Sequence, residues 1–137
     1  MLYMLDTDIS SYLIRKRPLE VLEVMQRKVE KGHDIVISVI TYAELLFGAE
    51  RSENPRKHRK IINEYRARVD QVLAWDADVA ETFSRVKAKL FDKGTPIGGN
   101  DTMIAAHALS IGAVVVTNNE KHFKCVKGLT LENWVRR

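Results

Sequence analysis

The sequence predicts an α/β fold: a three-layer α/β/α sandwich with a central, mostly parallel sheet. Short apolar runs rich in β-branched residues, such as 35–40 and 113–116, are typical of strands buried on both faces. Between them lie longer stretches whose apolar residues recur three and four positions apart, as in helices that cover such a sheet. With 137 residues, 45% of them hydrophobic, the chain can form one core, so we expect a single domain over residues 1–137.

Strand patterns and helix patterns alternate along the whole chain. In order, we expect a strand at 2–5, helices at 7–14 and 18–30, a strand at 35–40, a helix from 41, a basic helix from 55, a strand at 72–75, a long helix from 77 to about 91, a helix between 100 and 112, a strand at 114–116 and an edge strand within 129–134.

Several polar residues mark the expected helix starts, because their side chains can accept from unpaired backbone N–H groups. Asn54, Asp76 and Asn100 each precede such a helix. Thr41 and Glu44 form a Thr-x-x-Glu pattern that is typical of a capping box.

Acidic side chains recur just after the expected strands or at the starts of the helices that follow them. Because the carboxyl ends of parallel strands meet at one edge of a sheet, we expect such residues to gather there. The candidates are Asp6, Asp8, Glu44 and Asp101, with Thr117, Asn119 and Glu120 following the strand at 114–116. Each acid could instead be an ordinary helix-start residue, and Asp76 and Asp78 also follow a strand.

Clustered carboxylates need a proton or a cation. Two unit charges about 4 Å apart repel by roughly 4 kcal/mol at an effective dielectric constant near 20. Such a cluster therefore either raises its pKa values or binds a hard cation, and all-oxygen ligands favour Mg²⁺ or Mn²⁺. The lone cysteine, Cys125, excludes an internal disulfide and a thiolate cage for zinc.

The net charge of +4 is unevenly distributed. Between residues 51 and 68, seven Lys and Arg residues stand against two Glu residues, and smaller basic clusters occur at 15–17 and at 136–137. A solvated helix face would explain the first cluster, and contact with nucleic-acid phosphates is the alternative. The candidate RNA-binding residues are Arg56, Lys57, Arg59 and Lys60.

Two further expectations concern location and histidines. No apolar run is long enough to span a membrane and no signal peptide is evident, so we expect a cytoplasmic protein that does not bind membranes.

His107 is expected to pack beside small Ala residues, whereas His33, His58 and His122 are interpreted as surface residues.

Four sequence blocks occur together in an order that resembles the PIN-domain family. They are Leu5-Asp6-Thr7-Asp8, Thr41-x-x-Glu44-Leu45-x-x-Gly48, Ile97-Gly98-x-x-Asp101-x-x-Ile104-Ala105-x-His107-Ala108, and Val116-Thr117-Asn118-Asn119-x-x-x-Phe123. Within that family the chain is most similar to VapC-type toxin ribonucleases of bacterial toxin–antitoxin pairs. The resemblance spans essentially the whole chain.

The resemblance implies an endoribonuclease that binds Mg²⁺ or Mn²⁺ and hydrolyses RNA phosphodiester bonds, with tRNA as the leading substrate. Asp6, Glu44 and Asp101 match the family's catalytic acids, with Asp6 and Asp101 as metal ligands and Thr117 lining the pocket. The family's fourth acid is replaced here by Asn119, with Glu120 adjacent. Asp8 stands where many relatives carry Asn and can supply the missing charge.

The same resemblance implies partners. A VapB-type antitoxin is expected to cover the toxin and place an Arg in the acidic pocket, where a guanidinium can bind carboxylates bidentately. The toxin is expected to form a homodimer and a hetero-oligomer with the antitoxin, and to inhibit translation when released.

Two other functions compete with the ribonuclease interpretation. Asp6-x-Asp8 also resembles the nucleophile loop of haloacid-dehalogenase-type phosphohydrolases, although Glu44 would then have no role. A non-catalytic RNA-binding module would retain affinity for RNA in a chelator and would not depend on Asp101.

Overall fold

The computed structural model describes residues 1–135, so the basic pair Arg136 and Arg137 lies outside it. Its elements are β1 (Leu2–Leu5), α1 (Thr7–Arg15), α2 (Leu19–Glu30), β2 (Asp34–Ser38), α3 (Val39–Glu50), α4 (Pro55–Arg68), β3 (Gln71–Leu73), α5 (Ala77–Asp92), α6 (Gly99–Ile111), β4 (Val114–Val116), α7 (Glu120–Phe123) and β5 (Leu131–Glu132). Within residues 1–135, no helix combines the length and the apolar character that a membrane span requires.

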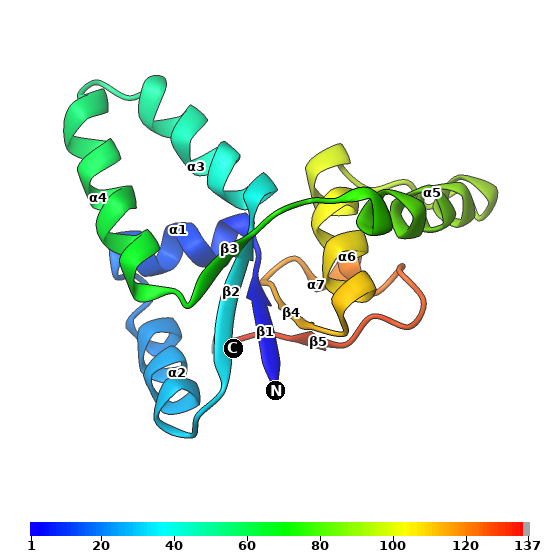
Figure 1. The fold of residues 1–137 in the computed structure, drawn as a ribbon, viewed down its shortest axis with the longest axis horizontal. Coiled ribbons are helices and arrows are strands. Elements are labelled where there is room, and N and C mark those ends of the chain that lie inside the picture. Colours follow the sequence, from blue (N-terminus) through cyan, green and yellow to red (C-terminus); the bar gives the residue numbers. More distant parts are fainter. Residues whose placement is uncertain (136–137) are drawn as a thin grey trace.

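The five strands form one sheet in the order β3-β2-β1-β4-β5, and all four pairings are parallel. This arrangement confirms the expected parallel sheet. The central strand β1 pairs with both β2 and β4, and Leu5 at its end lies opposite Val116. The carboxyl ends of β1, β2 and β4 therefore meet at one edge, between α3 and α6 (Figure 1).

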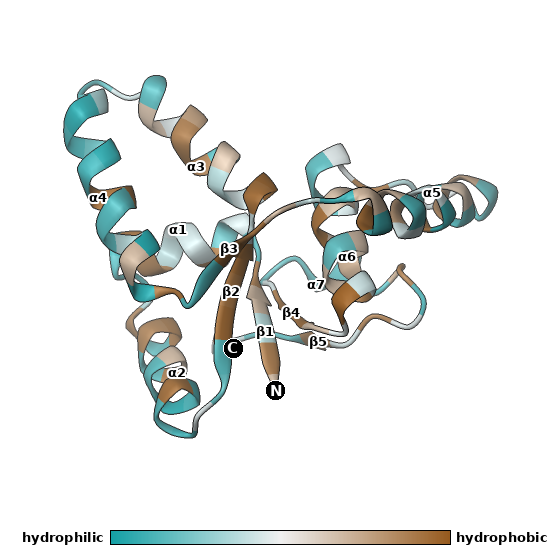
Figure 2. Ribbon diagram, in the orientation of Figure 1, coloured by the Kyte–Doolittle hydropathy of each residue, from teal (hydrophilic) through white to brown (hydrophobic). Residues whose placement is uncertain are grey.

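Helices cover both faces of the sheet, which confirms the three-layer sandwich. Figure 1 shows α1 to α4 on one side of the strands and α5 to α7 on the other. Successive side chains of β1 alternate between two cores: Tyr3 and Leu5 pack with the first group of helices, and Met4 packs with the second. The central strands are correspondingly apolar, whereas the outer surface of α4 is hydrophilic (Figure 2).

The second strand ends earlier than the sequence pattern predicts. Ser38 is the N-cap of α3, and its Oγ accepts from the N–H of Ile40 at 3.1 Å. The β-branched residues Val39 and Ile40 therefore begin the helix rather than extend the strand. Thr41 is buried inside α3, so the predicted capping box with Glu44 is wrong.

The boundaries of β3 and of the later helices agree only in part with the sequence prediction. Ser38 pairs with Leu73, so residues 74 and 75 have no strand partner and β3 is shorter than predicted. Asn54 and Asp76 cap α4 and α5 as expected. Asn100 does not cap α6, because the helix already begins at Gly99 with Gly98 at the N-cap.

Candidate active site

The predicted acids meet at the carboxyl edge of the sheet. Asp6 ends β1 and caps α1, Asp8 lies in the first turn of α1, Glu44 projects from α3 and Asp101 lies in the first turn of α6. Burial raises the pKa of both Asp6 and Asp101, and the charges of the group add to this effect: Asp8 and Asp101 raise the pKa of Asp6, and Asp8 and Glu44 raise the pKa of Asp101. The topology thus brings four carboxyl groups, carried by the end of β1 and by three helices, close enough for their charges to interact.

Asp6 is the most deeply buried member of this group. Only 2% of its surface is exposed, and its Oδ1 accepts from the N–H of Ile9 at 2.8 Å. Burial raises the pKa of Asp6 to about 7, the nearby carboxylates add to the shift, and hydrogen bonds from Thr117 and Ile9 oppose it. An ionised Asp6 therefore costs free energy unless a cation shares the pocket.

Glu44 is held in place by a residue that the sequence interpretation did not single out. Thr7 Oγ1 donates to Glu44 Oε1 at 2.6 Å, across the boundary between α1 and α3. Thr7 is the first residue of α1, directly after the cap residue Asp6. We assign Thr7 as a positioning residue for Glu44.

Asp101 lies beside Asn119 and His122. Asn119 Nδ2 donates to Asp101 Oδ2 at 3.5 Å and to His122 Nδ1 at 2.8 Å. His122 Nδ1 is 3.9 Å from the same carboxylate oxygen. His122 is exposed, as predicted, but its placement beside Asp101 was missed. It stands three residues after Asn119, a spacing that places two side chains on one face of a helix.

Asn119 and Glu120, the two residues expected near the position of the family's fourth acid, contact different partners. Asn119 faces Asp101, whereas Glu120 Oε2 accepts from Asn133 Nδ2 at 3.2 Å. Thr117 is fully buried, and its Oγ1 accepts from the N–H of Asn119 at 2.8 Å. Thr117 therefore links the buried Asp6 to the loop that carries Asn119.

His107 is buried, as expected, and connects the helices that carry two of the acids. Its Nδ1 lies 2.8 Å from Ser38 Oγ, the cap of α3. Since His107 belongs to α6 and Ser38 precedes α3, this contact joins the supports of Asp101 and Glu44. Burial lowers the pKa of His107, which favours the neutral ring.

Asp76 and Asp78 have a different role from the four acids. Asp76 Oδ1 accepts from the N–H of Val79 at 3.0 Å and so caps α5. Asp78 is an exposed residue of the first turn, where the helix dipole favours an acid.

The donor set fits a partly hydrated Mg²⁺ or Mn²⁺ rather than a closed protein cage. In the part of the chain that the structure describes, no three His, Cys, Asp or Glu side chains form a complete metal-binding group. Mg²⁺ is commonly held by one or two carboxylates, with water and substrate phosphate completing its shell. Asp6 and Asp101 fit that description, because burial and neighbouring negative charge disfavour their ionised forms in the absence of a cation.

Comparison with known proteins identifies the family. The model of the PIN domain family matches residues 3–129. The chain belongs to the PIN-domain family. Ribonuclease VapC2 of Haemophilus influenzae is 42% identical to it, over 97% of this chain and 98% of that protein. The tRNA(fMet)-specific endonuclease VapC of Shigella flexneri is 39% identical, over 96% of this chain and 97% of the relative.

Similar solved structures are also of VapC-type proteins, in complexes with their antitoxins. The structure of VapBC2 from Rickettsia felis, bound to a DNA fragment from its promoter, matches with a TM-score of 0.92 and 34% identity, over 98% of this chain and 100% of the other. VapBC from Salmonella typhimurium matches with a TM-score of 0.90 and 36% identity, over 98% and 100% of the two chains. The chain is therefore a PIN-domain ribonuclease of the VapC type.

Membership of the PIN-domain family replaces the haloacid-dehalogenase alternative. Glu44, which that alternative left without a role, lies in the same acidic group.

The basic candidates lie outside the acidic site, along α4. Arg56, Lys57, Arg59 and Lys60 are all exposed, and only a long contact of 3.9 Å joins Arg59 to Glu50. Exposure is compatible both with phosphate contact and with a solvated face, so the RNA-binding role of α4 stays a prediction.

Proposed function

We propose that this PIN-domain ribonuclease is a Mg²⁺- or Mn²⁺-dependent endoribonuclease that inhibits translation by hydrolysing RNA, with tRNA as its expected substrate. The observation that carries the proposal is the buried Asp6, whose raised pKa reflects both desolvation and the neighbouring Asp8 and Asp101. Such a carboxylate is suited to binding a divalent cation near a phosphodiester. The names of two relatives, the tRNA(fMet)-specific endonucleases of S. flexneri and S. typhimurium, support tRNA.

Each side chain has a distinct part in this proposal. Asp6 and Asp101 would hold the cation, which when bound supplies charge neutralisation at the phosphate and activation of water. Thr7 orients Glu44 at the edge of the site. The Asn119 amide places an N–H group beside Asp101, where it reduces the repulsion that an anionic substrate would meet.

The proposal is tested by incubating the purified protein with total cellular RNA and mapping the new RNA ends. We expect discrete new ends in Mg²⁺ or Mn²⁺, none in a chelator, and none with Asp101→Asn in either condition. Binding of RNA without new ends in any metal would instead support the non-catalytic RNA-binding module.

A separate prediction concerns the basic helix α4. Replacing Lys57 and Lys60 with Gln should weaken RNA binding and reduce the slope of log K against log salt concentration, by about 0.7 for each phosphate of a single strand that the protein no longer neutralises. Lys31→Gln with Lys87→Gln makes the same charge change at exposed positions elsewhere and should leave the slope unchanged. An unaltered slope in the α4 variant would assign those lysines to a solvated face.

The expected partner is a VapB-type antitoxin. VapBC complexes are the structural neighbours at 34 to 36% identity, and the acidic site provides a charge-complementary target for an Arg. We expect the toxin, as a homodimer, to bind this antitoxin and lose RNase activity. Truncating the Arg that enters the site should weaken inhibition more than binding, as measured by RNA cleavage and co-purification. A complex that retains full RNase activity would contradict this assignment.

A further inference from the structure

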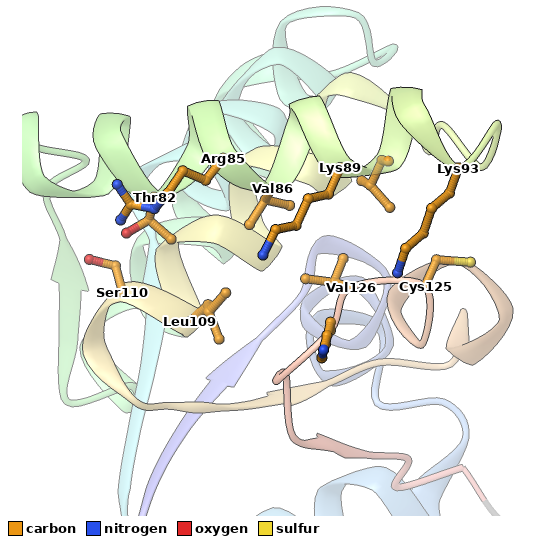
Figure 3. A pocket seen from close by; sticks show the side chains of 11 residues that line it. Thr82, Arg85, Val86, Lys89, Lys93, Leu109, Ser110, Cys125 and Val126 are labelled. Carbon is orange, nitrogen blue, oxygen red and sulfur yellow. The ribbon is translucent and has the colours of Figure 1, made fainter.

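A pocket of about 290 Å³ lies away from the acidic site, between α5, the last turn of α6 and the segment that follows α7. Figure 3 shows Arg85, Lys89 and Lys93 extending from α5 toward Ser110 and Cys125 on the opposite side. Its floor is apolar, and the buried residues Val86, Leu90 and Val126 contribute to it.

The charge of this pocket has one sign only. Arg85 and Lys89 lie four residues apart on α5, Lys93 follows four residues later as the C-cap of that helix, and Lys127 adds a fourth cation from the facing segment. No Asp or Glu lines the pocket, and none of the four cations forms an ion pair with another residue in 1–135. By contrast, the pocket beside α2 has acids as well as cations among its lining residues.

The size and lining of the pocket indicate what it can bind. At about 290 Å³, the pocket lies at the lower end of the range of ligand pockets, which run from about 300 to 1,000 Å³. It therefore suits a group the size of one nucleotide unit rather than a large cofactor. Cations of α5 and Lys127 can contact a phosphate, while Thr82 and Ser110 offer hydroxyls to a sugar.

The pocket lies within reach of an RNA strand that occupies the acidic site. Ser110 follows Asp101 by nine residues in α6, which corresponds to roughly 13 Å along a helix axis. That distance corresponds to a few nucleotides of an RNA strand. The α7 segment connects the same two regions, since Asn119 and His122 face Asp101 and Cys125 lines the pocket.

We propose that this α5–α7 pocket is a second RNA-binding site, which holds a backbone phosphate of the substrate a few nucleotides from the bond that is cut. The proposal rests on the ribonuclease function proposed above and adds a site on the face of the sheet opposite α4. RNA would then be held by contacts on the α5 side as well as by the acidic site.

The first test neutralises two cations of the pocket. Lys89→Gln with Lys127→Gln should weaken binding of a single-stranded RNA in chelator, where cleavage is blocked, and reduce the salt slope by about 1.4. Lys31→Gln with Lys87→Gln is the matched control; Lys87 lies on α5 but outside this pocket. Wild-type affinity and slope in the pocket variant would overturn the proposal.

The second test uses Cys125, the single cysteine of the chain, as a reporter inside the pocket. RNA of roughly eight nucleotides, enough to span both sites, should slow alkylation of Cys125 by N-ethylmaleimide several-fold. The Lys89→Gln, Lys127→Gln variant should lose this protection, and the control should keep it. Equal protection by inorganic phosphate alone would assign the pocket to a free anion and overturn the RNA site.

The outcomes separate the two proposals. RNA cleavage by the wild-type protein, together with unchanged RNA binding and Cys125 protection in the pocket variant, would reject the second site alone. Protection of Cys125 by RNA in a protein that never cleaves RNA would reject the proposed ribonuclease function and keep the binding site.

Discussion

Asp101→Asn is expected to reduce RNA cleavage by several orders of magnitude while leaving the fold intact. The substitution keeps the size of the side chain, and Asn119 and His122 remain beside it, but it removes one of the two negative charges proposed to hold the cation. The helix start tolerates the change, because Gly98 rather than Asp101 is the cap of α6. The measurement is the single-turnover cleavage rate in saturating Mg²⁺, with circular dichroism as the check on folding.

Asp76→Asn is the matched control for Asp101→Asn. Asp76 also follows a strand and begins a helix, yet its carboxylate caps α5. Since Asn and Asp are similar as caps, the change should cost at most about 1 kcal/mol of stability and leave the cleavage rate unaltered. Asp6→Ala should lose activity like Asp101→Asn. Equal losses of activity at positions 76 and 101, in folded proteins, would show that the site is wrongly placed.

The order of elements was predictable because the physical signals are local. Residues 114–116 are three consecutive valines, which favour a buried strand, and the stripe around Ile104 and Ala108 favours a helix beneath the sheet. The end of β2 was not predictable in the same way. Val39 and Ile40 have strand preferences, and only the hydroxyl of Ser38, placed by the tertiary structure beside His107, begins the helix there.

The gathering of the acids at one edge of the sheet was predictable from the order of strands and helices, without any side-chain contact. Parallel strands deliver their carboxyl ends to one edge, which places Asp6 there at the end of β1. Asp101 lies at the start of α6, the helix that returns the chain to the beginning of β4, so it reaches the same edge without knowledge of any side-chain rotamer. The choice between Asn119 and Glu120 depends on how α7 turns after β4, and Glu120 is directed to Asn133. His122 was missed because its proximity to Asp101 arises only when α7 forms.

Asp6→Asn is expected to stabilise the metal-free protein, although it should abolish activity. The Asn side chain can still accept from the N–H of Ile9 and cap α1, while the buried charge is removed. Because the pKa of Asp6 is about 7 in the folded protein and lies near 3.8 when the chain is unfolded, the folded state binds a proton more readily. Ionisation of Asp6 therefore destabilises the fold as pH rises from about 4 to above 7.

The difference in Tm between Asp6→Asn and the wild type tests this directly. In chelator at pH 8 the variant should melt higher, on the order of 5 °C or more, and the difference should vanish as pH falls toward 4. Asp76→Asn, an exposed cap with the same chemical change, should show no such pH dependence. Mg²⁺ should raise the Tm of the wild type but not that of Asp6→Asn, because the cation compensates the charge that the variant lacks. A variant less stable than the wild type at pH 8 would mean that the fold already compensates the buried charge of Asp6 without a metal.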